Sequence, residues 1–264
     1  MVTRKTVATN TILLLCCVIC LLIHVFPTNN TIINGILFGG FYKPFILAGE
    51  FWRLFTVGFV HIEFWHLAMN MMALYSLGRM FETVLGTKKY LIILFTSIIG
   101  GSLFIMASPQ NTFVVGLSGG LYGLMAAYVT LIIRSGGWRI PPVRAGLINM
   151  ILINALLNFL PEISVYGHLG GFVTGFLVYG MMTSKKEEKS RKIHYRFALG
   201  ALFVAVLFMG YQNRQIPLSQ RYLRIDIDVL QVEKNGFLSS YADTLANRLD
   251  NVYGLDFKLG SYLK

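Results

Sequence analysis

Seven apolar stretches, each about the length of a membrane span, recur along the 264-residue sequence. A helix needs about 20 mainly apolar residues to cross the hydrocarbon core of a bilayer. Backbone polar groups in that core have no water to bind, so an apolar run of this length folds as a helix. The sequence therefore predicts an all-α, polytopic membrane bundle with seven transmembrane helices. We expect them at residues 8–26, 64–84, 90–107, 117–133, 145–160, 165–183 and 197–211.

The composition agrees with this class of protein. Hydrophobic residues make up 55% of the chain and charged residues 13%, whereas soluble domains carry about 25% charged residues. The net charge of +11 is compatible with nucleic-acid binding, but most basic residues stand in short connections between apolar runs. Basic residues in such connections orient a membrane protein, so we expect no nucleic-acid partner.

Basic residues are distributed unequally over the two sides of the predicted bundle. The N-terminal segment and the connections on its side hold 14 Lys and Arg, whereas the connections on the opposite side hold only Lys43 and Arg53; the remaining seven lie in the tail after Tyr211. Connections rich in Lys and Arg face the cytoplasm. The sequence thus predicts an N-terminus inside, a C-terminus outside, and the start of the fourth helix near the outer surface.

The first apolar run permits two interpretations. Arg4-Lys5 followed by apolar residues up to Phe26 is also typical of a secretory signal peptide. The run is about as long as a full span and no small-x-small cleavage site follows it, which favours a retained helix. All three cysteines fall inside this run, without the spacing or polar neighbours of a disulfide framework or metal site. We expect no metal and no cofactor.

Three parts of the chain differ in character. Residues 1–183 hold six predicted helices and a first outer loop, 27–63, whose aromatic residues suit the membrane interface. Residues 184–211 comprise a basic connection and the seventh helix. Residues 212–264 form an amphipathic extracytoplasmic tail. One helical face of that tail carries Leu238, Tyr241, Leu245 and Leu249.

A glycine-flanked serine opens the fourth predicted helix. In Val115-Gly116-Leu117-Ser118-Gly119-Gly120 the glycines let the backbone turn sharply and let a second backbone come close. A serine that merely packs inside a helix requires neither a sharp turn nor the close approach of a second backbone. The stretch resembles the nucleophile turn of soluble serine hydrolases, although Gly-x-Ser-Gly alone is a weak motif. Ser118 is the candidate nucleophile.

Glycines at every fourth position mark both the fourth and the sixth helix. This small-xxx-small pattern lets two helices touch backbone to backbone. Such a contact would place His168, on the sixth helix, against Ser118. The glycines are Gly119 and Gly123 on the fourth helix, and Gly167, Gly171 and Gly175 on the sixth.

His168 is the candidate base. A serine hydroxyl attacks efficiently only when an adjacent base takes its proton, and neutral imidazole is the usual base. Tyr122, one helical turn after Ser118, is expected to orient the ring. No Asp or Glu lies deep in any predicted span, so we expect a serine–histidine dyad rather than a triad. A packed polar residue of the bundle is the alternative for His168 on its own.

His66 and Asn70 are four residues apart, so they share one face of the second helix. An oxyanion needs hydrogen-bond donors, which these side chains and the backbone N–H groups of Leu117 and Ser118 are expected to supply. A purely structural interhelical pair is the alternative for His66 and Asn70. The common depth of all these residues, near the outer ends of their helices, favours a shared site.

The combined motifs resemble those of the rhomboid intramembrane serine proteases, over roughly residues 8–183. The matching residues are Trp52-Arg53, His66-x-x-x-Asn70, Gly116-Leu117-Ser118-Gly119 followed by Tyr122, and His168-x-x-Gly171-x-x-x-Gly175.

The resemblance implies a rhomboid-like fold and an endopeptidase that cuts transmembrane segments of membrane proteins. It implies Ser118 as nucleophile, His168 as general base, and a site open to water from the outer face. The expected partners are transmembrane protein substrates and the lipid bilayer. The fifth helix and the loop from Pro161 to Val165 would form the substrate gate and cap. The short chain and the lack of a transit segment lead us to expect a bacterial plasma membrane.

Two other functions are compatible with a helical membrane bundle. A catalytically silent rhomboid-like protein would bind or recruit client membrane proteins, but such proteins have usually lost the serine or the histidine, and both are present. A transporter would carry charged residues at mid-membrane and broken helices in paired halves, and the sequence lacks both marks.

Overall fold

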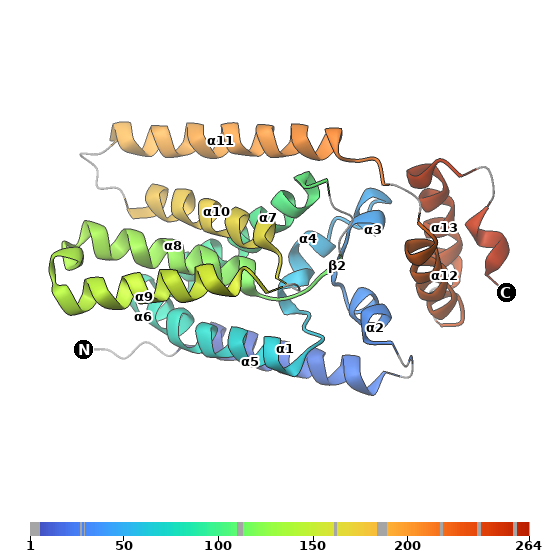
Figure 1. The fold of residues 1–264 in the computed structure, drawn as a ribbon, viewed down its shortest axis with the longest axis horizontal. Helices are drawn as coiled ribbons and strands as arrows, with labels where there is room; N and C mark the ends of the chain where they lie inside the picture. The colour runs from blue at the N-terminus through green and yellow to red at the C-terminus, as the bar shows by residue number, and fades with distance from the viewer. Residues whose placement is uncertain are drawn as a thin grey trace.

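The computed structural model describes residues 6–26, 28, 30–109, 113–160, 163–183, 189–216, 219–236, 239–255 and 258–263. Within these ranges the chain is mainly helical, and long helices run side by side in a bundle (Figure 1). A C-terminal hairpin of two helices, α12 (Gln220–Lys234) and α13 (Ser239–Tyr253), lies at one end of that bundle (Figure 1).

The long helices occupy the positions that the apolar runs predict. Three of them, α1, α7 and residues 192–212 of α11, are long and apolar enough to cross a membrane, and α9 is a shorter apolar helix. The second predicted helix is continuous through a π-helical turn, as α5 (Phe64–Ala73), η2 (Leu74–Gly78) and α6 (Arg79–Leu85). The others are α1 (Val7–Val25), α7 (Thr87–Ala107), α8 (Ser118–Arg134), α9 (Pro141–Leu157), α10 (Val165–Thr183) and α11 (Lys189–Gln212), with a short η3 (Gly137–Arg139) before α9.

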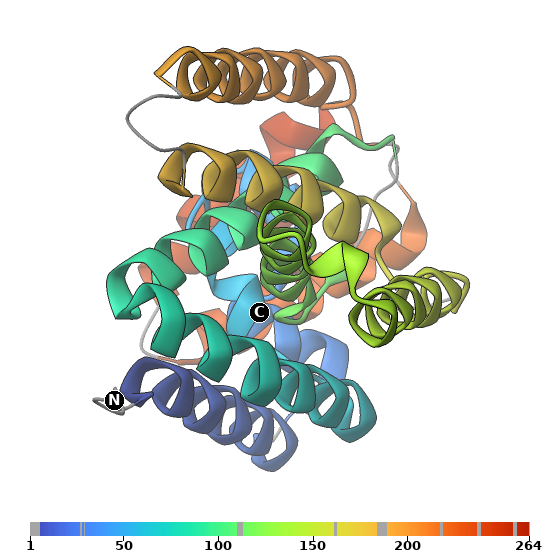
Figure 2. The same ribbon diagram turned by 90° about the vertical axis from the view of Figure 1, so that its left-hand side faces the viewer.

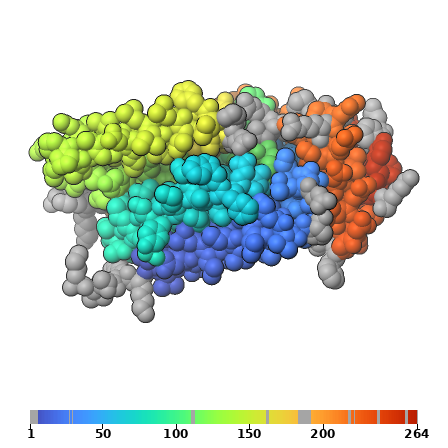
Figure 3. Space-filling model, turned by 60° about the horizontal axis from the view of Figure 1, so that its bottom comes forward, coloured from blue at the N-terminus to red at the C-terminus, as the bar shows by residue number. Residues whose placement is uncertain are grey.

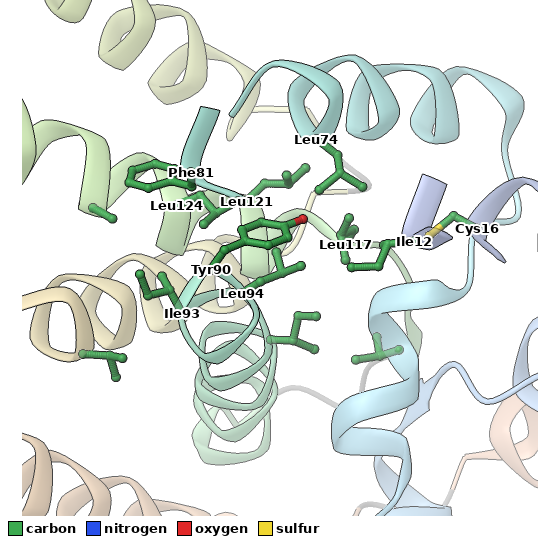
Figure 4. Packing of buried hydrophobic residues seen from close by; sticks show 14 of the residues in the cluster. Ile12, Cys16, Leu74, Phe81, Tyr90, Ile93, Leu94, Leu117, Leu121 and Leu124 are labelled. Atoms are coloured by element: carbon green, nitrogen blue, oxygen red, sulfur yellow. The ribbon is translucent and has the colours of Figure 1, made fainter. Parts of the chain in front are cut away.

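The centre of the bundle is α7, which packs against α8, α10 and α11. Figure 4 shows Tyr90 and Leu94 of α7 among Leu117, Leu121 and Leu124, all of them buried. Lipid is as apolar as these side chains, so burial from water contributes little to helix association inside a membrane. Close packing holds the helices together there, through many weak dispersion contacts.

The first loop is structured along most of its length. It contains α2 (Thr31–Leu37), β1 (Phe41–Tyr42), α3 (Lys43–Leu47), α4 (Arg53–Thr56) and η1 (Val57–Phe59). The sequence did not predict that β1 pairs antiparallel with β2 (Phe113–Val114), with Phe41 opposite Val114. This pair ties the first loop to the segment that leads into α8.

The C-terminal hairpin packs on the first loop. Tyr42 and Phe45 of the loop share a buried apolar cluster with Val229, Leu245 and Leu249 of the hairpin. Figure 3 shows the two regions, blue and orange, as neighbours on the surface. Leu238, which the sequence places on the same face, lies outside the described residues. The tail therefore buries its apolar face against the N-terminal part of the chain, and a short turn, η5 (Leu259–Tyr262), follows it.

Helix α9 lies at the edge of the bundle in the end-on view (Figure 2). Leu147 is its one buried residue, whereas Ile151, Leu152 and Leu156 are exposed and apolar. Such a surface suits contact with lipid. The loop expected to cap the site begins with residues 161–162, which lie outside the described ranges.

Candidate active site

Ser118 is the first residue of α8, and a sharp turn precedes it. After Val114, Gly116 adopts a φ of 119°, in a region that glycine enters readily and other residues avoid. The N–H of Gly116 donates to the carbonyl oxygen of Val57 at 3.0 Å, which joins the turn to the first loop. Ser118 is partly exposed at this helix start.

Helices α8 and α10 meet backbone to backbone. A Cβ added to Gly171 would lie 2.0 Å from the carbonyl oxygen of Gly119, and one added to Gly175 would lie 2.4 Å from the Cα of Gly123. Real Cβ atoms essentially never come within 3.0 Å of another heavy atom, so these positions require glycine. The glycine pattern thus brings the first turns of the two helices together, as expected from the sequence.

His168 lies in the first turn of α10, with only 5% of its surface exposed. Its imidazole stacks on the ring of Tyr122, with centroids 3.9 Å apart and an interplanar angle of 15°. Ser118 and Tyr122 are four residues apart and share a face of α8. That face is therefore turned toward His168.

A second side chain holds the imidazole from α9. Nδ1 of His168 lies 2.6 Å from Oδ1 of Asn158, the residue that follows α9. Nδ2 of Asn158 donates to the hydroxyl oxygen of Tyr122 at 3.1 Å, and that hydroxyl donates to the carbonyl oxygen of Asn154 at 2.9 Å. These hydrogen bonds connect α8, α9 and α10 around the ring of His168.

His66 and Asn70 lie against the turn before Ser118. A Cβ added to Gly116 would lie 2.6 Å from Cε1 of His66 and 3.6 Å from Nδ2 of Asn70. Asn70 is buried, and its Nδ2 donates to the backbone oxygen of His66 at 3.1 Å. The predicted oxyanion donors are thus brought to the N-terminal end of α8, where the helix dipole also favours negative charge.

His61 joins the site from the end of the first loop. It is fully buried, and its ring lies 5.3 Å from that of His66 at an angle of 65°. The N–H of Leu117, which the sequence suggested as an oxyanion donor, is directed at Nε2 of His61 over 3.4 Å.

Comparison with known proteins identifies the family. A family model described as the Rhomboid domain matches residues 48–186, slightly more than half of the chain. The chain belongs to the rhomboid family. With the helical architecture, this match confirms the predicted all-α rhomboid membrane bundle.

Curated relatives resemble this rhomboid over part of their length. RHOMBOID-like protein 1 of Arabidopsis thaliana is 29% identical over 183 residues, covering 61% of the chain and 46% of the relative. Rhomboid protease GluP of Bacillus subtilis (strain 168) is 29% identical over 181 residues, covering 67% and 35%. RHOMBOID-like protein 2 of Arabidopsis thaliana is 30% identical over 175 residues, covering 60% and 55%. The chain thus spans less than two thirds of the length of these relatives.

Trp52 and Arg53 organise the first loop of this rhomboid. The Arg53 side chain is buried, its Nε donates to Glu50, and its Nη1 donates to the carbonyl oxygens of Ile36 and Gly40, the latter at 3.1 Å. The guanidinium carbon lies 4.4 Å from the centroid of the Trp52 ring. Both residues act on the loop that precedes the site.

Sequence reasoning missed Asn158 and assigned His61 no role. An amide in an apolar helix is a signal of function, because polar groups inside a membrane are costly. Asn158, however, stands ten residues before His168, across a predicted helix break, so no helical periodicity connects the two. Only the folded chain brings them together.

Proposed function

We propose that this rhomboid is an intramembrane serine endopeptidase that uses Ser118 and His168. The observation that supports this most strongly is the stacking of His168 on Tyr122, which holds an imidazole beside the helix turn that begins with Ser118. The name of one relative, Rhomboid protease GluP, adds support.

In the proposed reaction, Oγ of Ser118 attacks the carbonyl carbon of the scissile peptide bond while Nε2 of His168 takes the hydroxyl proton. The tetrahedral intermediate collapses, the C–N bond breaks, and the imidazolium returns the proton to the leaving amine. A water molecule then attacks the acyl-enzyme, with His168 again as base. Ser118 is regenerated and the new carboxyl end leaves.

We assign oxyanion stabilisation to His66, Asn70 and the N–H of Ser118. Preorganised donors aimed at developing charge supply the largest single contribution to many enzymatic rates. The N-terminal end of α8 adds the positive end of its dipole. Both side chains lie against Gly116, next to the proposed nucleophile.

The proposed substrates are transmembrane segments of proteins in the bilayer. A helix shields its peptide bonds, because every carbonyl is hydrogen-bonded within the segment. Segments weakened by Gly or Pro should therefore be cleaved faster than an uninterrupted leucine helix. We keep the prediction that the N-terminus lies inside, so that the site opens at the outer face. The protein belongs in a membrane, and the bacterial plasma membrane stays a prediction, since relatives come from plants as well as Bacillus.

Replacing Ser118 tests the proposal. The full chain and its Ser118→Ala variant are reconstituted in proteoliposomes with a tagged single-span substrate containing a central glycine, and products are followed by mass spectrometry. We expect Ser118→Ala to lower the cleavage rate by at least about 10³-fold, since the nucleophile itself is removed. A fluorophosphonate probe should label the unaltered protein and not the variant.

Ser135→Ala, at the other end of α8, is the matched control and should cleave normally. Undiminished cleavage by Ser118→Ala would refute the proposal. Absence of cleavage and of labelling in the unaltered protein, with the substrate still captured, would support the alternative of a catalytically silent rhomboid-like protein that binds clients.

A further inference from the structure

Asn158 can contact His168 in only one orientation. Its side-chain amide has one atom near the carbonyl oxygen of Asn154, at 2.9 Å, and its other end near Nδ1 of His168, at 2.6 Å. A backbone carbonyl only accepts hydrogen bonds, so the atom facing Asn154 is the donor Nδ2. The atom facing His168 is consequently the acceptor Oδ1.

The hydroxyl of Tyr122 is consistent with this orientation. Its single proton goes to the carbonyl oxygen of Asn154 at 2.9 Å, which leaves a lone pair to accept from Nδ2 of Asn158 at 3.1 Å. Both protons of the Asn158 amide are thus used on two oxygens. Every hydrogen bond in this group has one donor and one acceptor.

The orientation of Asn158 determines which nitrogen of His168 carries the proton. Because Oδ1 only accepts, Nδ1 of the neutral ring must be the donor. The lone pair then resides on Nε2, the nitrogen that a general base has to offer to a serine. The hydrogen-bond partner of Nδ1 thus determines that Nε2 is the basic nitrogen.

We propose that Asn158 is a positioning residue for catalysis, the third member of a Ser118–His168–Asn158 group. It holds the ring of His168 with Nδ1 protonated, and its amide oxygen stabilises the imidazolium that forms when the ring takes a proton. This inference rests on the proposed function, and it replaces the expected dyad with a triad that has a neutral amide in place of a carboxylate. Cysteine proteases with a Cys-His-Asn group use the same chemistry.

The position of Asn158 also links the base to α9. That helix buries Leu147 alone, and hydrogen bonds from Asn158 and to Asn154 join its C-terminal end to α8 and α10. A displacement of this end of α9 large enough to break the 2.6 Å contact would take the acceptor away from Nδ1. His168 is therefore fully positioned only while the C-terminal end of α9 is packed against α8 and α10.

Two substitutions of Asn158 separate positioning from packing. Asn158→Leu keeps a similar size and removes the acceptor, whereas Asn158→Asp keeps an acceptor and adds a charge. Asn149→Leu is the matched control, because Asn149 is an exposed amide on the same helix. The full chain with each substitution is reconstituted in proteoliposomes with the single-span substrate, and kcat, KM and the pH–rate profile are measured.

We expect Asn158→Leu to lower kcat on the order of 10- to 100-fold with KM nearly unchanged. The loss should be smaller than the ~10⁴-fold loss on neutralising a triad aspartate, because a neutral amide stabilises imidazolium less. Asn158→Asp should retain more activity and move the acidic limb of the profile to higher pH, since a carboxylate favours protonated imidazole. Tyr122 and His66 are the titratable groups that face His168, and neither is altered by these substitutions.

Wild-type kcat in Asn158→Leu would overturn the inference. So would an Asn158→Asp variant with low kcat and an unshifted pH profile, because that result indicates a packing role; this variant also serves if the leucine variant fails to fold. Ser118→Ala is measured alongside. If it still cleaves, the proposed function fails; if it is inactive while Asn158→Leu is normal, only the role of Asn158 fails.

Discussion

The ring of Tyr122 lies nearly parallel to the imidazole of His168, at a centroid distance of 3.9 Å. This stacking and the two hydrogen bonds of the Tyr122 hydroxyl act on the same ring in different ways. The stacking limits tilt, whereas the hydroxyl joins Asn154 and Asn158 to the group. The two contributions can be separated by substitution.

Tyr122→Phe should keep the stacking and lose the hydroxyl. We expect kcat to fall about 2- to 10-fold, corresponding to the ~0.5–1.5 kcal/mol of a typical hydrogen bond. Tyr122→Leu removes the ring as well and should lower kcat by roughly a further 2- to 10-fold, because aromatic pairs contribute ~0.5–1.5 kcal/mol. Steady-state cleavage in proteoliposomes measures both. Equal activity of the two variants would show that stacking does not matter.

Gly171→Ala should separate α8 from α10. The added methyl group would lie 2.0 Å from the carbonyl oxygen of Gly119, a backbone atom that cannot rotate away. Overpacking of this kind costs ~1–3 kcal/mol or more, so we expect a lower midpoint of thermal unfolding and loss of most activity. Gly146→Ala is the control, since a Cβ there meets nothing within 4 Å. If both variants behave alike, close helix contact is not required.

Arg53→Lys should loosen the first loop. A lysine ammonium keeps the charge but lacks the planar fork that reaches Glu50 and the carbonyl oxygens of Ile36 and Gly40 at once. Leaving a buried acceptor unpaired costs about 1–3 kcal/mol. We expect faster proteolysis within residues 30–59 and reduced cleavage activity. Limited proteolysis followed by mass spectrometry locates the effect, and proteolysis at unchanged rates contradicts it.

Attachment of the C-terminal hairpin should depend on pH. Asp226 of α12 is fully buried and accepts hydrogen bonds from Tyr42 at 2.8 Å and from Tyr253 at 2.6 Å. Burial raises the pKa of Asp226 from 3.8 to about 7, while the two hydrogen bonds lower it. Burial likewise raises the pKa of Glu233 to about 7, beside Glu50 and Arg53.

A raised carboxyl pKa means that the folded state binds the proton more tightly than the unfolded state. The stabilisation that this tighter proton binding at Asp226 gives the folded state is therefore complete below about pH 4 and is lost as the pH rises through 7. Asp226→Asn removes this ionisation, so the variant should be less sensitive to pH and more stable than the unaltered protein at pH 8. The difference is at most about 4 kcal/mol for three pKa units.

Thermal unfolding in detergent at pH 5 and pH 8 measures this effect. Asp228→Asn, on the same helix and less buried, is the control and should keep the pH dependence of the unaltered protein. Asp226→Asn, Glu233→Gln and their combination should show progressively smaller differences between the two pH values. If the midpoint of thermal unfolding changes equally between pH 5 and pH 8 in the unaltered protein and in Asp226→Asn, Asp226 is not a buried, protonated carboxyl group.

The long helices could be predicted because length and apolarity alone determine whether a segment crosses a bilayer. The contact between α8 and α10 could be predicted as well. Glycines at positions 119, 123, 171 and 175 let the two backbones come close, and such close packing is favourable. Both features follow from the spacing of residues along a helix. A membrane span requires one apolar run, and the contact requires glycines at every fourth position of each helix.

Three features could not be predicted because they join residues that no periodicity connects. Asn158 reaches His168 across a helix break, and β1 pairs with β2 over a separation of some seventy residues. The attachment of the hairpin depends on Tyr42 meeting Asp226, 184 residues later. The amphipathic face of the tail indicated that something covers it, but many apolar surfaces would serve.

The position of the hairpin also affects the order in which parts of this protein fold during synthesis. Tyr42 and Phe45 leave the ribosome long before Asp226 and Leu245, which later cover them. Contacts this distant in sequence form late, because a long loop must close first. During synthesis the first loop therefore waits with an uncovered apolar face, although Ser118 and His168 already exist. The first loop, which β1 ties to the segment that leads to Ser118, is thus covered only by residues translated well after that serine.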